Sequence, residues 1–431
     1  MIYNSLNKKS NPAAFPEAVV RGIAPDRGLY FPEKIHRLPD AFFDNIEQES
    51  VFEIAFQAIA PFVEGSIPEN ELRKIIEETL DFDFPVVPIT DQIGTLELFQ
   101  GPTLAFKDVG ARFMARCLGY FNKENTSQKI TVLVATSGDT GGAVANGFLG
   151  VPGIEVVILY PKGKVSEVQE QQLTTLGQNI TALEVDGVFD DCQDMVKTAF
   201  LDKDITQYKQ LTSANSINIA RWLPQMFYYF IAYRTLKKKN KPLVVSVPSG
   251  NFGNICAGLM AREIGLPIDH FIASTNINDV VPDFLTTGVY TPKKSSPTIS
   301  NAMDVGDPSN FIRILKIFGD DLDNLKETLS GYRFTDDETR EALKEIHTTS
   351  GYVADPHGAV GYLGLKAYLK DHPEKYGIFL ETAHPVKFLD TVEDSLNIKV
   401  DIPERLKETL SKTKKSIPIQ DYQGLKDFLL R

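Results

Sequence analysis

The pattern of apolar and polar residues changes its period several times along the chain. Over residues 51–80, which include SIPENELRKIIEETL, apolar positions recur about every 3.6 residues and predict helices. The stretch DFDFPVVPIT interrupts this pattern, because its prolines disfavour helix, and it predicts a boundary. GTLELFQGPT then predicts a short strand, and KDVGARFMARCLGYF predicts a helix.

Two later segments repeat one design. The β-branched run KITVLVAT is followed by the glycine turn SGDTGG and the helix-like AVANGFLG, and PLVVSVP is followed by SGNFGN and ICAGLMAREIG. Strand, glycine turn and helix form the half-unit from which parallel α/β sheets are built. We therefore predict an open α/β architecture with two sheet domains behind a mainly helical N-terminal region.

The expected domains follow from where these units lie. Residues 1–90 form the largely helical N-terminal region. Residues 91–225 form a smaller α/β domain with Lys107 and the SGDTGG loop. Residues 226–431 form a larger α/β domain with the SGNFGN loop and the motif ETAHP.

Composition limits the possible partners. The 431 residues carry 57 acidic and 45 basic side chains, a net charge of −12, which argues against nucleic acid but leaves room for a small anionic ligand. Cys117, Cys192 and Cys256 are far apart and form neither a disulfide framework nor a recognisable zinc site, so no metal is expected. No apolar run approaches the roughly 20 residues of a membrane span. We expect a soluble cytoplasmic monomer or homodimer.

The SGNFGN loop lies between a predicted strand and a predicted helix. Gly250 and Gly253 permit positive φ and close approach of the backbone to a ligand. The helix that begins near Asn254 would direct free N–H groups and its positive dipole end at an anion. The loop therefore suits a phosphate, although a plain tight turn without a ligand is the favoured interpretation when the loop is considered alone. It matches neither the Walker A pattern nor GxGxxG.

The segment TSGDTGGA, residues 136–143, repeats this geometry with more polar side chains. A helix N-terminus here suits a carboxylate or a phosphate. Asp139 would repel an anion if it pointed inward, so we expect it to face elsewhere or to meet a donor. A plain strand-to-helix turn is again the alternative.

Lys107 follows the apolar residues Leu-Ala-Phe at the start of a predicted helix. A helix N-terminus and weakly polar surroundings both disfavour the ammonium form, which would lower the pKa of the lysine. Schiff-base chemistry requires such an amine. The alternative, which the local sequence alone favours, is a lysine paired with Asp108 on a surface turn.

Two further polar clusters follow predicted strands. In SANSINIARWLPQ, Asn215, Asn218 and Arg221 would share one face of a helix, and Arg221 could bind a phosphate through two hydrogen bonds. The alternative is a helix cap at Ser213 or Asn215 with an exposed arginine. ETAHPVKF follows the strand-like YGIFL, at a place where open α/β sheets bind ligands. We expect His384 to be a structural hydrogen-bonding group rather than a general base.

The joint order of these motifs carries a resemblance that no single motif carries. A lysine in FKD, then SGDTGGA, NSINIAR, SGNFGN and ETAHP, resembles the fold-type II pyridoxal-phosphate enzymes, whose fold is like that of the tryptophan synthase β chain. The match is closest to the threonine synthase family. The N-terminal stretch FPEAVVRGIAPDRGLYFPE also resembles the opening of that family. Cysteine synthase and serine/threonine dehydratase share the lysine and the glycine loops but not this opening or ETAHP.

The resemblance implies pyridoxal 5'-phosphate as the cofactor. Lys107 would be the catalytic residue, holding the cofactor as a Schiff base and then acting as acid and base. Thr382 would hydrogen-bond the pyridine nitrogen. The cofactor phosphate would be bound by backbone N–H groups of Gly250, Asn251, Phe252, Gly253 and Asn254.

The resemblance also implies the substrate contacts. Backbone N–H groups would receive the substrate α-carboxylate at Ser137, Gly138, Thr140 and Gly141, and the substrate phosphate would meet Asn215, Ser216 and Arg221. Asp139 stands where many relatives have an asparagine that reaches the ring hydroxyl of the cofactor.

The reaction that the resemblance implies is the last step of threonine biosynthesis, catalysed by a carbon–oxygen lyase acting on a phosphate. O-phospho-L-homoserine and water give L-threonine and phosphate, by γ-elimination and then addition of water at Cβ. One alternative is a serine/threonine dehydratase-type β-eliminating lyase, which would not need Arg221. Another is a protein that binds the cofactor without turnover.

Overall fold

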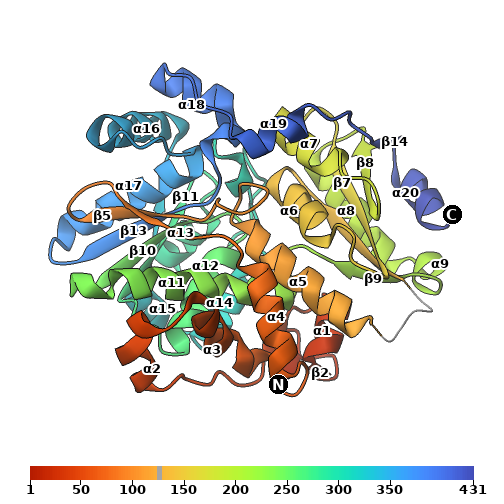
Figure 1. Cartoon of the computed structure of the whole chain (residues 1–431), viewed down its shortest axis with the longest axis horizontal. Coiled ribbons are helices and arrows are strands. Elements are labelled where there is room, and N and C mark those ends of the chain that lie inside the picture. The colour runs from red at the N-terminus through yellow and green to blue at the C-terminus, as the bar shows by residue number, and fades with distance from the viewer. Residues whose placement is uncertain (124–128) are drawn as a thin grey trace.

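The computed structural model describes residues 1–123 and 129–431 as an α/β protein with two mainly parallel sheets (Figure 1). The larger sheet has the order β12-β11-β10-β13-β5-β4 and the smaller one the order β14-β8-β7-β6-β9. Every pairing in them is parallel except that of β4 with β5. The predicted fold class is confirmed.

The larger sheet is covered by helices on both faces. The central strands are buried at every position, which is why they read as continuous apolar runs rather than alternating ones. Its strands are β4 (Val86–Pro88), β5 (Ile93–Glu97), β10 (Leu243–Pro248), β11 (His270–Thr275), β12 (Leu329–Arg333) and β13 (Tyr376–Glu381). The helices of this part are α11 (Met226–Leu236), α12 (Gly253–Glu263), α13 (Val280–Thr287), α14 (Phe311–Ile317), α15 (Leu322–Thr328), α16 (Asp336–Ser350), α17 (Pro356–Asp371) and α18 (Leu389–Leu396), with the short η3 (Lys237–Lys239), η4 (Asn301–Met303) and η5 (Pro385–Phe388).

The smaller sheet has the same construction. Its strands are β6 (Ile130–Ala135), β7 (Ile154–Pro161), β8 (Ile180–Val185), β9 (Gln210–Ser213) and β14 (Ile417–Ile419). The helices near it are α5 (Lys107–Phe121), α6 (Asp139–Phe148), α7 (Glu167–Thr174), α8 (Phe189–Leu201), α9 (Lys203–Thr206), α10 (Ile219–Trp222), α19 (Glu404–Leu410) and α20 (Tyr422–Leu429), with η2 (Leu223–Gln225).

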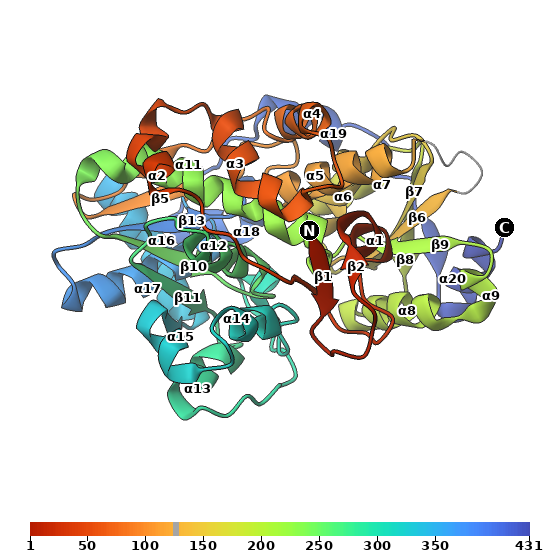
Figure 2. The same cartoon turned by 90° about the horizontal axis from the view of Figure 1, so that it is seen from below.

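The N-terminal region packs against both halves (Figure 2). It contains a small antiparallel sheet of β1 (Ile2–Ser5), β2 (Ala13–Ala14) and β3 (Tyr30–Pro32), followed by α1 (Phe15–Arg21), α2 (Asp40–Asn45), η1 (Ile46–Gln48), α3 (Val51–Val63) and α4 (Glu69–Thr79). The helices expected over residues 51–80 are α3 and α4, and Ser50 caps α3 by accepting the N–H of Glu53 at 3.1 Å.

Sheet membership follows the expected domain ranges only in part. Residues 93–97 were expected in the smaller domain, but β5 pairs with β13 of the larger sheet. The C-terminal residues were expected in the larger domain, but β14 pairs with β8, and α20 lies beside α8 and α9, where Lys426 binds Asp204 at 2.6 Å (Figure 2). The apolar pattern identifies a strand but not its neighbour, which depends on contacts distant in sequence.

Two composition-based expectations can be compared with the structure. All three cysteines are free and buried, as small apolar side chains would be. Within residues 1–123 and 129–431, no helix combines the length and the apolar character that crossing a membrane requires.

Candidate functional site

The predicted site segments come directly after the carboxyl ends of parallel strands. Residues 136–141 follow β6, residues 214–218 follow β9, residues 249–254 follow β10 and Thr382 follows β13. Side-chain hydrogen bonds join them, because Asn215 Nδ2 donates to the Ala135 carbonyl at 3.3 Å and Asn251 Nδ2 donates to Ser216 Oγ at 2.8 Å. The second bond connects the two sheets at the edge where open α/β folds bind ligands.

Lys107 is the first residue of α5 and lies beside the end of β13. The N–H of Phe106 donates to the Thr382 carbonyl at 2.9 Å, and Ala105 forms a bridge with Ala383. Lys107 is partly buried. Burial lowers the pKa of its amine, and Asp139 partly offsets this effect. A lowered pKa favours the nucleophilic amine, as the sequence predicted.

The expected alternative partner of Lys107 is occupied elsewhere. Asp108 is buried, and its carboxylate accepts the N–H of Thr103 at 2.9 Å as well as the Thr103 hydroxyl. The interpretation of Lys107 and Asp108 as an ion pair on a surface turn is therefore wrong.

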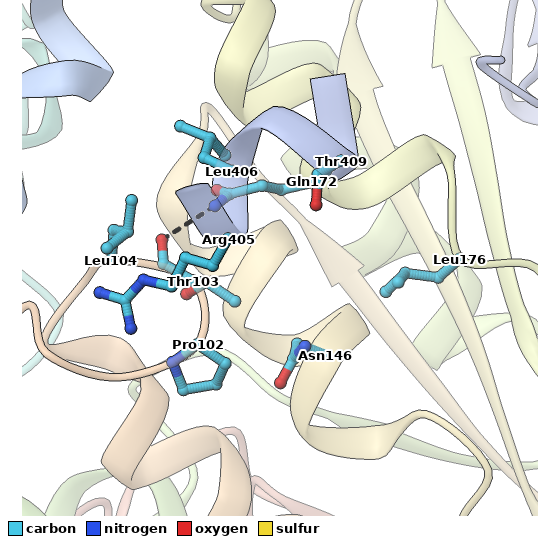
Figure 3. Close-up of a pocket in the computed structure, with 9 residues that line it drawn as sticks. All are labelled: Pro102, Thr103, Leu104, Asn146, Gln172, Leu176, Arg405, Leu406 and Thr409. Atoms are coloured by element: carbon cyan, nitrogen blue, oxygen red, sulfur yellow. Dashed lines mark hydrogen bonds between the residues drawn. The ribbon is translucent and has the colours of Figure 1, made fainter. Parts of the chain in front are cut away.

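A small cavity of about 40 Å³ lies behind the segment that leads into α5, between α6, α7 and α19 (Figure 3). Gln172 Nε2 donates to the Thr103 carbonyl across it at 3.1 Å. This volume suits a water molecule rather than a substrate. None of the predicted site residues lines it.

The 250–254 loop has the properties of an anion cradle. No backbone N–H from Gly250 to Asn254 has an acceptor among the residues that the structure describes. The α12 helix begins at Gly253 and adds its positive end. A Cβ on Gly250 would lie 2.7 Å from the Ala302 carbonyl oxygen, so only glycine fits there.

One detail of this loop differs from the prediction. We expected positive φ at the glycines, but the left-handed residue is Phe252, with φ of 61°, and neither Gly250 nor Gly253 has positive φ. The Phe252 ring packs edge-on against Phe311, with centroids 5.9 Å apart. This buried aromatic contact offsets the cost of the left-handed backbone.

The 136–141 loop distributes its N–H groups differently. Thr136 Oγ1 accepts the N–H of Gly138 at 3.0 Å and that of Gly141 at 2.9 Å, two groups that we expected on a substrate carboxylate. The N–H groups of Ser137, Asp139 and Thr140 have no acceptor within residues 1–123 and 129–431. These three donors are the ones the loop can offer to a ligand.

Asp139 meets donors, as expected. Its Oδ1 lies 2.7 Å from Lys387 Nζ and accepts from Gln169 Nε2 at 3.0 Å. Burial alone would raise the pKa of Asp139, but Lys387, Lys107 and Gln169 together lower it to about 2. Sequence reasoning did not identify Lys387 or Gln169. The lysine does stand within ETAHPVKF, flanked by Val and Phe, which is an unusual setting for an exposed lysine.

Arg221 is 2% exposed and lies against α5 at Gly110, where a Cβ would come 3.1 Å from Arg221 Nε. Its Nη1 donates to the Ala214 carbonyl, whereas Nε has no partner among the described residues. Burial lowers the pKa of Arg221 to about 10, against the influence of Asp108, so the guanidinium is charged at neutral pH. The interpretation of an exposed arginine is therefore wrong, and the Nε–H group is a buried donor without an acceptor among the described residues.

The helix cap in this segment is not at the residues expected. Asn218 caps α10, because its Oδ1 accepts the N–H of Ala220 at 3.0 Å. Asn215 precedes the helix, so the predicted helical face shared by Asn215, Asn218 and Arg221 does not form.

Thr382 is buried, and its hydroxyl makes no hydrogen bond within the described part of the chain. His384, two residues later, accepts the N–H of Val386 through Nδ1 at 3.1 Å and starts η5. The structural role expected for His384 is confirmed.

A buried polar network behind Thr382 escaped sequence reasoning. Glu381 Oε1 accepts the N–H of Asp355, and Asp355 Oδ2 accepts that of Ala383 at 3.2 Å. Asp355 Oδ1 lies 2.6 Å from His357 Nδ1, and the N–H of Ala302 donates to His357 Nε2 at 3.2 Å. The Ala302 bond makes Nε2 an acceptor and so places the imidazole proton on Nδ1. The network links the neighbours of Thr382 to the segment that packs on Gly250.

Comparison with known proteins agrees with this geometry. The family model described as "Pyridoxal-phosphate dependent enzyme" matches residues 95–380, and "Threonine synthase N terminus" and "Threonine synthase, C-terminal" match residues 2–80 and 358–429. The chain is 44% identical over 432 residues to the threonine synthase of Buchnera aphidicola subsp. Acyrthosiphon pisum, covering 100% of this chain and 99% of the relative.

Solved structures are similar along the whole chain. The crystal structure of threonine synthase from Escherichia coli has a TM-score of 0.93 and 40% identity, covering 100% of this chain and 99% of that one. The structure of PLP-bound threonine synthase from Brucella melitensis has a TM-score of 0.93 and 32% identity, with coverage of 100% and 98%. The resemblance first noted from the order of the motifs is confirmed.

Proposed function

The chain belongs to the threonine synthase family of pyridoxal-phosphate-dependent enzymes, and on that premise we propose that it converts O-phospho-L-homoserine and water into L-threonine and phosphate. One observation carries the proposal. The site offers two candidate anion positions: the 250–254 loop, whose five backbone N–H groups have no acceptor among the described residues, and the buried Arg221, whose Nε has none there either. A cofactor phosphate and a substrate phosphate together require two such positions.

The residues present fit pyridoxal phosphate. The 250–254 loop would hold its phosphate, the Lys107 amine would attach it covalently, and the Thr382 hydroxyl would meet its pyridine nitrogen. When bound, the cofactor stores the electrons released as a proton leaves the substrate Cα.

Lys107 is suited to carry protons. The proposed reaction removes protons from Cα and Cβ, expels the γ-phosphate, and then returns a proton at Cγ. Water then adds, with its hydroxyl at Cβ and a proton at Cα. The amine makes no hydrogen bond to another described residue, and burial lowers its pKa, which favours the uncharged form that accepts a proton. A well-placed acid–base group contributes ~10²–10⁴-fold to such a step.

Two sets of donors would orient the substrate. The N–H groups of Ser137, Asp139 and Thr140 would bind its α-carboxylate at the start of α6. Arg221, with Asn215 and Ser216 beside it in the chain, would bind its phosphate. A substrate without that phosphate would leave the buried Nε of Arg221 without an acceptor among the described residues, which disfavours a dehydratase-type reaction.

A product assay tests the proposal directly. Purified chain with pyridoxal phosphate is given O-phosphohomoserine, and phosphate and threonine are measured; a parallel sample with threonine is tested for keto acid. Equal release of phosphate and threonine is expected. Keto acid from threonine without phosphate release would instead establish a β-eliminating lyase.

Lys107→Ala tests the cofactor anchor. We expect loss of both turnover and the absorption band of the lysine-bound cofactor, because no other group replaces the covalent bond. If the band and turnover both persist, Lys107 is not the anchor.

Arg221→Ala tests the position of the substrate phosphate. Loss of a charged hydrogen bond of ~1.5–3 kcal/mol predicts a KM that is about ten- to a hundred-fold higher. Arg221→Lys keeps the charge and should lose less. An unchanged KM in Arg221→Ala would place the phosphate elsewhere.

We also propose a cytoplasmic location, which the three buried free cysteines support, because a reducing compartment maintains thiols. A monomer or homodimer remains our expectation, and sedimentation at several protein concentrations would measure it.

A further inference from the structure

A second lysine, Lys387, is among the charged groups that influence Lys107. Lys387 belongs to η5, and its side chain is fully buried. Its Nζ is 2.7 Å from Oδ1 of Asp139, the first residue of α6, whose side chain is 4% exposed. The pair therefore joins the segment after β13 to the helix after β6, across the two sheets.

A buried ion pair of this kind calls for an explanation, because the desolvation penalty of two charges often exceeds the free energy gained from their attraction. The charged groups that influence Lys107 are Asp139 from α6, Arg221 from α10 and Lys387 from η5. Asp139 is the only carboxylate among the three. The cation in contact with it is Lys387, not Lys107.

The consequence concerns the protonation of Lys107. A carboxylate that pairs with a lysine stabilises the ammonium form, which is neither a nucleophile nor a base. With Lys387 absent, Lys107 would be the remaining lysine near Asp139. With Lys387 present, Asp139 already has an ammonium partner and the amide of Gln169.

We propose that Lys387 is a positioning residue: by occupying Asp139 it prevents this carboxylate from pairing with Lys107, and so favours the uncharged form of the Lys107 amine, which attaches the cofactor and moves protons. The assignment of Lys107 rests on the proposed function. The effect on its amine can be measured without the reaction.

The test uses the full-length chain without cofactor. An amine-reactive acylating reagent is added at limiting concentration over a range of pH, and modification of Lys107 is followed by peptide mass spectrometry. Lys387→Met keeps the length of the apolar stem and removes the charge. We expect the Lys107 profile to move to higher pH, so that the rate constant near neutral pH falls about ten-fold or more, as one pKa unit requires. The appearance of the absorption band after addition of pyridoxal phosphate should slow by a similar factor.

Two further variants distinguish this role from a merely structural one. Lys387→Met combined with Asp139→Asn should return the Lys107 profile to within about three-fold of the unaltered chain, because the competing carboxylate is gone. Asp139→Asn alone should move the profile to lower pH, since Lys387 then acts on Lys107 without a counterion. This single variant also tests the proposal if Lys387→Met does not fold.

Lys375→Met is the matched control. It removes a lysine from a different ion pair, with Asp269 at 2.8 Å, and should leave the Lys107 profile unchanged. The proposal is overturned if folded Lys387→Met has an unaltered profile, or if the double variant does not restore a shifted one. If the Lys107 profiles shift as predicted but the chain forms no threonine, the role of Lys387 is supported and the proposed function is overturned.

Discussion

Replacement of Glu381 by glutamine tests whether the core holds a neutral carboxylic acid directly behind Thr382. Glu381 is fully buried, its Oε1 accepts the N–H of Asp355, and its Oε2 has no partner among the described residues. Burial, and next the nearby Asp355 carboxylate, raise the pKa of Glu381 well above its ordinary value. A glutamine has the same shape and offers the same carbonyl to Asp355.

The sign and size of the effect follow from proton linkage. A carboxyl group with a raised pKa keeps its proton in the folded chain and releases it on unfolding. The free energy of unfolding therefore falls by ~1.4 kcal/mol for each pH unit above the ordinary glutamate value, until the folded group itself ionises. Glutamine has no such proton. Above about pH 5.5, Glu381→Gln should therefore gain ~1.4 kcal/mol per pH unit relative to the unaltered chain, over the range in which folded Glu381 keeps its proton.

Urea unfolding, followed by the fluorescence of Trp222, measures this difference, because Trp222 is the single tryptophan and is fully buried. Glu338→Gln is the control. Hydrogen bonds from Thr335 lower the pKa of Glu338, so this group is ionised in both states across the whole range and its replacement should cost the same at each pH. A Glu381→Gln difference that is equally flat would show that Glu381 is ionised in the folded chain.

Two glycine substitutions test the loops. Gly138→Ala forces a φ of 154° on alanine and places its Cβ 2.5 Å from Gln169 Nε2. The free energy of unfolding should fall by ~1–3 kcal/mol through backbone strain, and further because Gln169 loses its hydrogen bond to Asp139. Gly177 has a φ of 66° and no neighbour near its Cβ position, so Gly177→Ala should lower the free energy of unfolding in urea by only ~1–2 kcal/mol. Equal losses for Gly138→Ala and Gly177→Ala would contradict the predicted contact with Gln169. Gly250→Ala should weaken binding of pyridoxal phosphate at least about ten-fold in an absorbance titration, because its Cβ would displace the segment at the Ala302 carbonyl, and unchanged affinity would argue against the cradle.

The parts of the fold that the sequence predicts are those with local signals. The runs that became β6 and β10 are β-branched and end in glycine turns, so strand, turn and helix could all be identified within about twenty residues. The pairing of β5 with β13 could not, because it joins residues nearly three hundred positions apart, and neither strand carries a local signal that identifies its neighbour.

The site was predictable in a similar, partial way. Lys107 and the two glycine loops were found through the order of the motifs. Lys387, Glu381, Asp355 and His357 were not, because their role depends on burial, and a lysine or a glutamate in a sequence is by default an exposed side chain. The left-handed residue of the phosphate-type loop was assigned to glycine on steric grounds, whereas a packing contact with Phe311 allows it at Phe252.

The two strand–glycine–helix units look alike in sequence, but the structure gives them different capacities. In the 250–254 loop all five backbone N–H groups are free of acceptors among the described residues, which suits the several oxygens of a phosphate. In the 136–141 loop the hydroxyl of Thr136 takes two N–H groups and leaves three, and the Asp139 side chain is held by Lys387 instead of opposing an anion. A single hydroxyl and a single ammonium thus reduce a potential phosphate site to one better matched to a carboxylate. This difference supports the assignment of the cofactor phosphate to the first loop and the substrate carboxylate to the second.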